Sequence, residues 1–239
     1  MSNAVLVTGA NRGIGLAIAE AFHAAGYAVA AGHRAPEDAA ALRERGFTPV
    51  QCDVTSADSV DSAFDAAESV LGPVGVAVAN AGVTRDGLLM RMTDDDVAAV
   101  LDTNVAGAIR VARRASKSMV RARSGRIIFI GSVVGLLGNA GQANYAASKA
   151  ALVGLARSTA RELGGRGITA NVIAPGFVTT DMTADLAAEQ QEQLLAQIPM
   201  RRYASPDEIA QVALFLASDA ASYITGAVVP VDGGMGMGH

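Results

Sequence analysis

The 239-residue sequence has little of what disulfide-bonded, zinc-dependent and nucleic-acid-binding proteins require. Its single cysteine, Cys52, excludes an internal disulfide and any multi-cysteine zinc site. The histidines His23, His33 and His239 are scattered without metal-ligand spacing, so we expect no catalytic metal. Lysine and arginine number 19 against 23 acidic residues, and a net charge of −4 argues against a nucleic-acid partner. We expect Cys52 to be a small buried hydrophobe at the end of a strand.

Long hydrophobic runs are also missing, although hydrophobic residues make up 51% of the chain. The excess comes from alanine and valine, since aromatic residues account for only 4%. No run approaches the roughly 18 residues that a membrane-spanning helix needs. The first residues, MSNAVLVTGA, reach a glycine turn without a basic region, so we expect no signal peptide and a cytoplasmic location.

Short β-rich runs alternate with longer helical patterns along the whole chain. Most of these runs are continuously apolar, which is typical of parallel strands that are buried on both faces. Strand–helix alternation predicts right-handed βαβ units. We therefore predict an α/β fold, a single doubly wound Rossmann domain over residues 1–239 with a seven-stranded parallel sheet flanked by helices. The predicted strands are residues 4–9, 27–32, 47–53, 74–80, 126–132, 168–175 and 227–232.

Two later helices have well-marked beginnings. Thr93 precedes three aspartates, which indicates an N-cap followed by an acidic first turn. Residues 205–208, Ser-Pro-Asp-Glu, indicate a capping box with proline at the first helical position. Between two core elements, residues 183–199 form a polar stretch with a helical pattern, and we predict a substrate lid there.

A glycine turn joins the first predicted strand to the first predicted helix. Glycines at this place allow a tight turn and a close approach of the backbone to a pyrophosphate, while the helix N-terminus supplies free N–H groups. A purely structural glycine turn is the alternative. The residues of this predicted phosphate-binding turn are Gly9, Asn11, Arg12, Gly13, Ile14 and Gly15.

The second predicted strand ends without the acidic residue that binds the ribose diol of NAD. A basic residue in that region suits the additional phosphate of NADP. Arg34 stands there, and Arg12 can close on the same phosphate through charge-assisted hydrogen bonds. We therefore predict NADPH/NADP+ as the cofactor, with two ordinary surface arginines as the alternative.

The stretch YAASK places Tyr145 and Lys149 on one face of a helix, separated only by small side chains. Reduction of a ketone needs a hydride and a proton, and a free tyrosine has a pKa of about 10. A nearby lysine ammonium and the positive nicotinamide ring of an oxidised cofactor would favour the phenolate. A solvated surface pair is the alternative.

Two further polar residues fit the same chemistry. Ser132 ends the fifth predicted strand, where its hydroxyl can donate to a developing oxyanion. Asn104 lies within a predicted helix, where asparagine is unfavourable. A simple helix kink beside Gly107 is the alternative for Asn104.

Five motifs occur in one order: TGxxxGxG, NAG at residues 80–82, Ser132, YAASK, and PG at residues 175–176. Together they resemble the short-chain dehydrogenase/reductase family over essentially the whole chain. The resemblance implies a catalytic tetrad of Asn104, Ser132, Tyr145 and Lys149. In that tetrad Asn104 holds a water in a proton relay toward the lysine, and Lys149 also holds the nicotinamide ribose.

The resemblance implies further cofactor contacts and an assembly. It pairs the helices that carry Tyr145 and Asn104 with their symmetry mates, and it packs the last strand and C-terminal tail across a second two-fold axis, which gives a homotetramer. The implied cofactor contacts are Asp53 and Val54 beside the adenine, Asn80, Ala81 and Gly82 beside the ribose, Tyr145 and Lys149, and Pro175, Gly176, Val178 and Thr180 in the loop that covers the nicotinamide.

Finer motifs indicate the substrate class. The stretches NAGVTRDGLLMRM, RIIFIGSVVG, GQANYAASKAAL and GAVVPVDGGMGMGH are similar to the β-ketoacyl-[acyl-carrier-protein] reductases of this family, particularly the actinobacterial long-chain form of the mycolic-acid pathway. The sequence departs from that form at LLGNAG, residues 136–141, which is more similar to the general bacterial enzymes. Because this segment should line the acyl pocket, the preferred chain length stays open.

We therefore expect NADPH-dependent reduction of 3-oxoacyl-[acyl-carrier-protein] to 3-hydroxyacyl-[acyl-carrier-protein] in fatty-acid elongation. One alternative is another carbonyl reductase of this fold, acting on acetoacetyl-CoA or a polyketide. The other is a non-catalytic NADP-binding scaffold or sensor. Activity on carrier-linked and CoA-linked substrates separates the first two, and an intact tetrad argues against the third.

A carrier-protein substrate requires a basic docking patch, because acyl carrier proteins are acidic and this chain is itself negative. Arg121, Arg123 and Arg126 precede the fifth predicted strand, and Arg166 precedes the sixth. Arg123 and Arg166 match the two arginines that the general bacterial reductases use for docking. Loops before parallel strands lie at the opposite end of the sheet from the active site, so a neighbouring subunit's entrance is implied. Solvated arginines on turns are the alternative.

Overall fold

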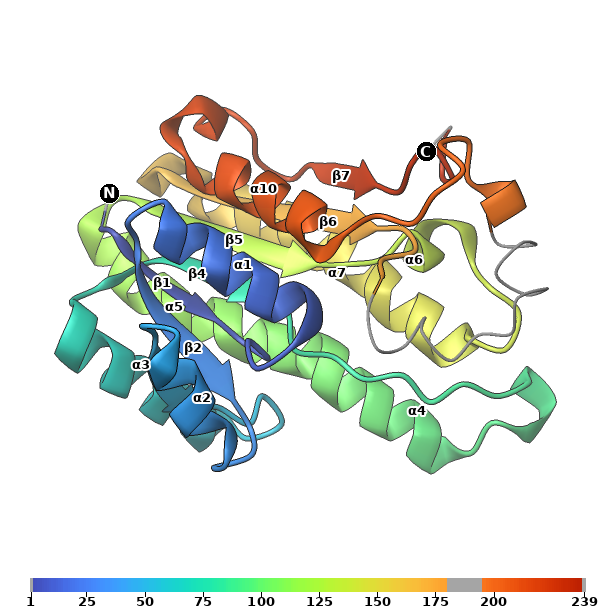
Figure 1. Cartoon of the computed structure of the whole chain (residues 1–239), viewed down its shortest axis with the longest axis horizontal. Helices are drawn as coiled ribbons and strands as arrows, with labels where there is room; N and C mark the ends of the chain where they lie inside the picture. Colours follow the sequence, from blue (N-terminus) through green and yellow to red (C-terminus); the bar gives the residue numbers. More distant parts are fainter. Residues whose placement is uncertain (1, 180–194, 238–239) are drawn as a thin grey trace.

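The computed structural model of the protein describes residues 2–179 and 195–237, and its centre is one parallel sheet (Figure 1). The strand order is β3-β2-β1-β4-β5-β6-β7, and each neighbouring pair is parallel. This confirms the predicted seven-stranded parallel sheet. The strands are β1 (Ala4–Val7), β2 (Ala28–His33), β3 (Thr48–Gln51), β4 (Val74–Ala79), β5 (Gly125–Ile130), β6 (Ile168–Pro175) and β7 (Val228–Val231).

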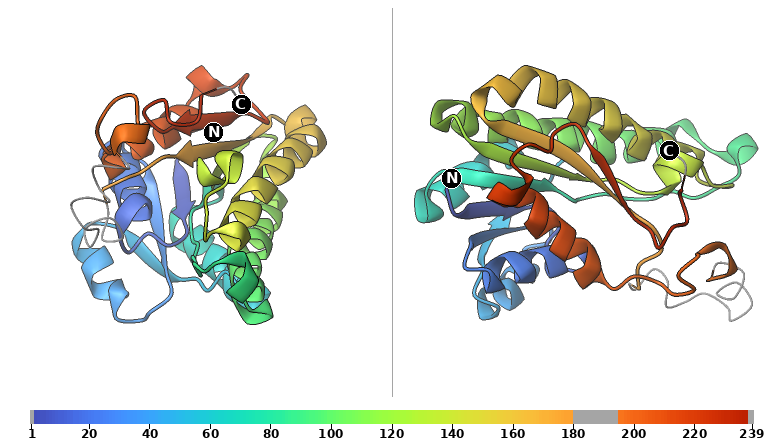
Figure 2. Two further views of the ribbon diagram at one scale, coloured as in Figure 1. Left: turned by 90° about the vertical axis from the view of Figure 1, so that its right-hand side faces the viewer. Right: turned by 90° about the horizontal axis from the view of Figure 1, so that it is seen from above.

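Helices cover both faces of the sheet, as Figure 2 shows. Every residue of β1, β4, β5 and β6 is buried, which explains why these strands read as unbroken apolar runs. Apolar side chains of α3, α5 and α7 pack on one face, and those of α1, α2 and α10 pack on the other. These helices are α1 (Gly13–Ala24), α2 (Asp38–Glu44), α3 (Ala57–Leu71), α5 (Gly107–Ala122), α7 (Ala143–Leu163) and α10 (Pro206–Ala217).

Shorter helical elements connect these layers. Among the residues that the structure describes, no helix is long and apolar enough to cross a membrane. Cys52 is buried beyond β3, as expected, and burial raises the pKa of its thiol to about 12. The shorter elements are η1 (Leu89–Arg91), α4 (Asp94–Leu101), η2 (Asp102–Ala106), α6 (Val134–Leu137), η3 (Gly164–Arg166) and η4 (Asp219–Ala221).

Both helix beginnings that the sequence marks are confirmed. Thr93 caps α4 in a capping box with Asp96, and Ser205 caps α10 in a capping box with Glu208 and with proline at the first turn. In each box the hydroxyl accepts from a backbone N–H, and the acidic side chain accepts from the N-cap N–H. These local bonds need no tertiary partner, so the sequence pattern alone identifies them.

The helix predicted around Asn104 is not a continuous α-helix. A π-helical turn, η2, separates α4 from α5, and Asn104 lies in the middle of it. A Cβ on Gly107, the first residue of α5, would lie 2.8 Å from Cγ2 of Val54, so the chain packs closely there. Single π-turns inside α-helices are uncommon and are often found at functional sites.

The strand order reverses between β1 and β4. From β1 the chain proceeds outward through β2 and β3, and from β4 it proceeds the other way. In open α/β sheets a ligand binds in the crevice beyond the carboxyl ends of the strands at this point. In Figure 1 these ends point to the right, where α6 and the start of the loop after β4 also lie.

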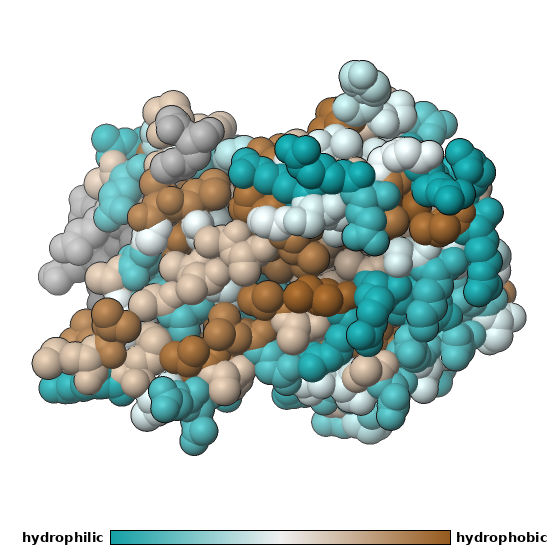
Figure 3. All heavy atoms as spheres, turned by 180° about the vertical axis from the view of Figure 1, so that it is seen from behind, coloured by the Kyte–Doolittle hydropathy of each residue, from teal (hydrophilic) through white to brown (hydrophobic). Residues whose placement is uncertain are grey.

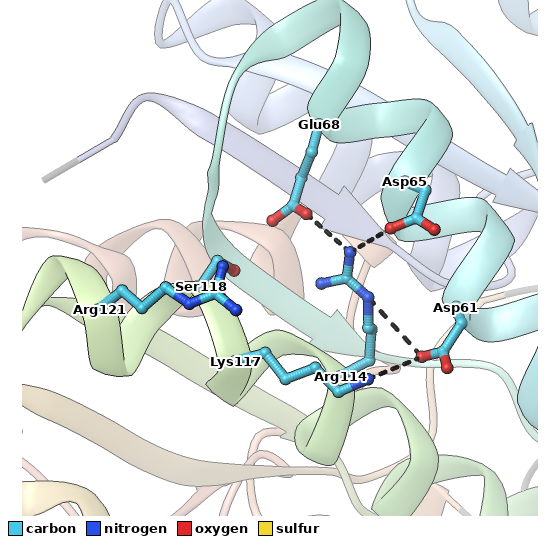
Figure 4. A pocket seen from close by; sticks show the side chains of 7 residues that line it. All are labelled: Asp61, Asp65, Glu68, Arg114, Lys117, Ser118 and Arg121. Carbon is cyan, nitrogen blue, oxygen red and sulfur yellow. Dashed lines mark hydrogen bonds and ion pairs between the residues drawn. The ribbon is translucent and has the colours of Figure 1, made fainter.

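A polar hollow between α3 and α5 lies on a helical layer rather than at the carboxyl ends of the strands (Figure 4). Arg114 of α5 is buried there and donates to Asp65 at 2.6 Å and to Glu68 at 2.7 Å. Its guanidinium also lies 5.0 Å from the ring centroid of Phe64. These contacts join two helices, and we assign the cluster a structural role.

Candidate active site

The glycine turn lies where β1 meets α1, at the reversal of strand order. Gly9 has a φ of +64°, and Gly15 begins the buried face of α1. A Cβ on Gly15 would collide with the backbone oxygen of Gly9 and with Nδ2 of Asn80. The N-cap of α1, Arg12, offers no side-chain acceptor to the first turn. The turn therefore has both the close backbone approach and the uncapped N–H groups that a pyrophosphate needs.

Thr8 and Asn80 hold this turn against the end of β4. The Thr8 hydroxyl accepts from the backbone N–H groups of Asn80 and Ala81, both at 3.1 Å. Nδ2 of Asn80 donates to the backbone oxygens of Thr8 at 2.9 Å and Gly9 at 3.1 Å. Asn80, predicted beside the ribose, thus shapes the glycine turn directly, while Ala81 and Gly82 follow it at the crevice.

The predicted phosphate-selecting arginines are both exposed, at the same end of the sheet. Arg12 is the N-cap of α1, and Arg34 directly follows β2. Beyond β3, Asp53 accepts from the N–H and the hydroxyl of Thr55, and these bonds lower the pKa of the carboxyl. Val54 is buried beside Asp53. Asn11, Gly13 and Ile14 complete the turn at the start of α1.

Tyr145, Ser132 and Lys149 converge at the carboxyl ends of β4 and β5. The Ser132 hydroxyl lies close enough to the phenol of Tyr145 to lower its pKa. Nζ of Lys149 lies 5.6 Å from the Tyr145 ring centroid and donates to the backbone oxygen of Ile130 at 2.8 Å. A Cβ on Gly135 would lie 2.9 Å from Cβ of Lys149, so the segment after Ser132 packs tightly on α7. β5 itself ends at Ile130, two residues earlier than predicted for the strand with Ser132.

The electrostatics of the pair differ from the expected phenolate-favouring arrangement. Burial raises the pKa of Tyr145 and outweighs the lowering effect of the nearby Ser132 hydroxyl, and the carboxylate of Asp86 raises this pKa further. Burial also lowers the pKa of Lys149 to about 8. Desolvation is the largest effect on both groups, and Lys149 is not among the causes that act on the Tyr145 pKa. That an oxidised nicotinamide ring favours the phenolate stays a prediction. A protonated phenol is the form that a ketone reduction consumes.

Asn104 is buried, and both the oxygen and the nitrogen of its side-chain amide form hydrogen bonds. Oδ1 accepts from the N–H of Val83 at 2.8 Å, and Nδ2 donates to the oxygen of Val83 at 3.0 Å and to the Ser148 hydroxyl at 2.9 Å. The Ser148 hydroxyl donates in turn to the oxygen of Tyr145 at 2.7 Å. Asn104 therefore joins the chain after β4 to the helix that carries Tyr145 and Lys149.

The loop after β6 begins where the nicotinamide cover was predicted. The oxygen of Pro175 accepts from Val133 N–H at 2.8 Å, and Gly176 packs so closely on Asp232 that a Cβ there would lie 2.8 Å from Cα. Val178 is buried and bridges to Ala204. Thr180 lies outside the described residues, as do residues 183–194 of the predicted lid, so both stay predictions.

The predicted docking arginines precede β5 and β6, so they lie at the end of the sheet opposite the crevice. Arg123 and Arg166 are exposed, and a Cβ on Gly167 would lie 2.6 Å from the oxygen of Arg123, so the two turns pack together. Arg126 does not belong to this surface, contrary to the sequence-based expectation. Its side chain is buried, donates to the oxygen of Gly125 at 3.0 Å, and lies 3.6 Å from Asp219.

Several residues that shape the site were not singled out from the sequence. These residues are Thr8, Ser148 and Asn144. Their side chains form hydrogen bonds with residues that lie 44 to 73 positions away in the chain. Thr8 belongs to the TGxxxGxG motif and could have been found there. Ser148 and Asn144 stand among small and polar residues beside Tyr145 and give no separate signal.

Comparisons with known proteins show what the whole chain is similar to. A family model described as enoyl-(acyl carrier protein) reductase matches residues 9–236. The 3-oxoacyl-[acyl-carrier-protein] reductase MabA of Mycobacterium tuberculosis is 54% identical over 239 residues, covering 100% of this chain and 95% of the relative. MabA of Mycobacterium avium is 51% identical over 242 residues, covering 100% and 92%. The reductase FabG of Escherichia coli is 46% identical over 235 residues, covering 97% and 96%.

Proposed function

Because the chain belongs to the short-chain dehydrogenase/reductase family, we propose that it reduces 3-oxoacyl-[acyl-carrier-protein] to 3-hydroxyacyl-[acyl-carrier-protein] with NADPH in fatty-acid elongation. The observation that carries this proposal is the convergence of Ser132, Tyr145 and Lys149 beside a glycine turn whose uncapped helix N-terminus suits the pyrophosphate of a dinucleotide. Relatives with the same reaction in their names match essentially the full chain. A cytoplasmic location is part of the proposal.

The residues of the chain divide the chemistry between them. When bound, NADPH supplies the hydride that adds to the 3-oxo carbon. The Tyr145 hydroxyl then gives its proton to the carbonyl oxygen, which becomes the 3-hydroxyl, and Ser132 donates a hydrogen bond to the same oxygen. The Lys149 ammonium stabilises the phenolate that remains. Asn104 holds the relay water through which the proton is replaced.

A comparison of substrates tests this function against its nearest alternative. Purified protein is given NADPH with 3-oxoacyl groups of several lengths, each linked either to acyl carrier protein or to coenzyme A. We expect higher kcat/KM on the carrier-linked series. A preference for CoA esters or for a free ketone would instead favour another carbonyl reductase of this fold, and binding of NADPH without any turnover would favour a scaffold or sensor.

Arg12 and Arg34 support NADPH rather than NADH. Among the described residues, no carboxylate forms an ion pair with either guanidinium, so none competes with a phosphate for it. Both arginines flank the crevice. A charge-assisted bond to the 2′-phosphate contributes roughly 1.5–3 kcal/mol, or about 10- to 100-fold in affinity. Arg34→Ala should therefore raise the KM for NADPH by about that factor and change the KM for NADH little. Equal kcat/KM for the two cofactors in the wild type would contradict this assignment.

Exposed apolar surface supports a homotetramer. Leu101 of α4 and Ile109 of α5 are 38% and 43% exposed, and small residues such as Ala147 and Gly154 are also exposed on α7. Figure 3 shows hydrophobic side chains in several bands across this face of the molecule. Light scattering at micromolar concentration should give four times the 24.2 kDa mass of one chain. A mass near that of one chain would refute the assembly.

Arg123 and Arg166 support docking of the acidic carrier at this tetramer. Arg123 has a φ of +52°, a left-handed conformation that costs a non-glycine residue roughly 1–2 kcal/mol. Glycine would adopt this conformation without strain. The presence of arginine there is consistent with a role for its charge. Across an interface, the pair can lie near the site entrance of a neighbouring subunit.

Charge reversal tests the docking. Arg123→Glu/Arg166→Glu should lower kcat/KM on carrier-linked substrate, and the wild-type advantage should fade at high salt because electrostatic steering is screened. Activity on a short carrier-free 3-oxoacyl substrate should hardly change. Arg43→Glu/Arg45→Glu, at the exposed end of α2, makes the same charge change elsewhere as a control. Equal losses on both substrates would show that the two arginines are structural.

A further inference from the structure

The segment after the NAG turn, residues 83–87, is attached to the residues that precede and begin α7. The oxygen of Arg85 accepts from Nδ2 of Asn144 at 2.9 Å. The carboxylate of Asp86 accepts from Nε2 of Gln142 at 2.9 Å, and the Gly87 N–H donates to the oxygen of Gly141 at 2.8 Å. The segment therefore runs directly from the cofactor side of the crevice to the start of the catalytic helix.

Asn144 is the buried member of this attachment and stands next to Tyr145 in the sequence. Its side chain belongs to a residue that is only 4% exposed. Nδ2 donates to the segment through Arg85, while Oδ1 accepts from the backbone N–H of Tyr145 at 2.7 Å. A single amide thus spans the distance between the 83–87 segment and the residue that carries the acid.

The start of α7 lacks an ordinary N-cap bond, and Asn144 supplies an acceptor for a backbone N–H of the first turn instead. Gln142 occupies the N-cap position, but its side chain accepts no bond from the first turn. It bonds to Asn139 and Asp86 instead, both at 2.9 Å. Serine, threonine, aspartate or asparagine would cap better at that position. The N-cap preference is therefore not met where α7 contacts the 83–87 segment, and such departures are common at functional sites.

We propose that Asn144 is a positioning residue. It connects the 83–87 segment to the first turn of α7 and so fixes the position of Tyr145 relative to the cofactor. Both ends of the connection bear on the reaction. The segment follows residues 80–82 at the ribose, and Asn104 holds its first residue, Val83. Reacting atoms must come within about 3–3.5 Å, and a misplacement of about 1 Å can cost roughly 100-fold in rate.

Asn144→Asp separates the two bonds of this amide. The aspartate keeps an oxygen that can accept from Tyr145 N–H, and a negative charge in the first helical turn is favourable. It has no N–H to donate to Arg85 and would place a carboxylate against that carbonyl. We therefore expect kcat to fall roughly 10- to 100-fold. The KM for NADPH should stay close to the wild-type value, and the Tm should fall no more than that of the control variant described next.

Asn171→Asp provides a matched control in β6. Asn171 is also buried, and it also bridges two segments: Nδ2 donates to the oxygen of Ile224 at 2.8 Å, and Oδ1 accepts from Ala227 N–H at 3.1 Å. The substitution removes the same kind of donor from a bridge between β6 and the residues before β7, not from the start of α7. We expect a lower Tm with kcat within about twofold of wild type.

The measurements are steady-state kinetics, NADPH fluorescence titration and thermal unfolding on the full-length protein. The inference rests on the proposed carbonyl reduction, but the variants are compared on whichever carbonyl substrate the wild type reduces best, so the two can fail separately. Wild-type kcat in Asn144→Asp would overturn the inference. It would also be overturned if both Asp variants lost kcat in proportion to their loss of Tm, because the effect would then be general destabilisation.

Discussion

Replacement of Tyr145 by phenylalanine should abolish ketone reduction and leave NADPH binding nearly intact. The ring and its packing stay, and only the hydroxyl, which the Ser132 side chain influences, is lost. Proton transfer from a positioned side chain typically contributes about 10²–10⁴-fold, so turnover should fall by at least roughly 100-fold. Steady-state turnover and a fluorescence titration with NADPH measure the two quantities separately.

Tyr223→Phe removes a hydroxyl from a fully exposed tyrosine and controls for the substitution itself. It should leave both turnover and binding at the wild-type level. If Tyr145→Phe kept more than about a tenth of wild-type turnover, Tyr145 could not be the acid. The same conclusion would follow if the two tyrosine variants were equally active.

Replacement of Gly15 by alanine should abolish cofactor binding altogether. A Cβ at this position lies well inside 3.0 Å of the Gly9 oxygen and of Asn80 Nδ2, a separation that real Cβ atoms essentially never show. Relief requires movement of the glycine turn or of α1, and either change removes the surface on which the pyrophosphate rests. We expect no measurable NADPH binding, no turnover and a lowered Tm.

Gly164→Ala tests whether this loss is specific to the turn. Gly164 has helical φ and ψ angles of −56° and −40°, and an added Cβ meets no atom within 4 Å. Alanine should therefore be accepted there without loss of binding or stability. Near-normal NADPH affinity in Gly15→Ala would show that the turn does not hold the cofactor in the way we describe.

The sheet and the capped helices could be predicted from the sequence because their signals are local. Continuous apolar runs such as AVLV and VGVAVA indicate strands that are buried on both faces, and both capping boxes were found where the sequence marks them. The ends of strands are less well marked in the sequence. The pattern predicts that the fifth strand reaches Ser132, while β5 ends at Ile130. The N–H of Gly131 still donates to the oxygen of Ile173 at 2.7 Å, so the strand has no sharp end that a sequence pattern could mark.

The features that were missed depend on residues that are distant in the chain. The π-turn at Asn104 accompanies bonds to Val83 and Ser148, which lie 21 and 44 positions away. The raised pKa of Tyr145 is chiefly due to burial, which its sequence neighbours do not reveal. Arg126 was placed in a surface patch because its neighbours in the chain are basic, although its position in β5 buries it.

The most direct test follows the hydride from the cofactor into the product. Purified protein is given deuterium-labelled NADPH together with equal amounts of 3-oxoacyl- and enoyl-[acyl-carrier-protein], and mass spectrometry identifies the acyl products. We predict a 3-hydroxyacyl product that carries one deuterium, with the enoyl substrate unchanged. A labelled saturated acyl product, or no labelled product at all, would contradict the proposed carbonyl reduction.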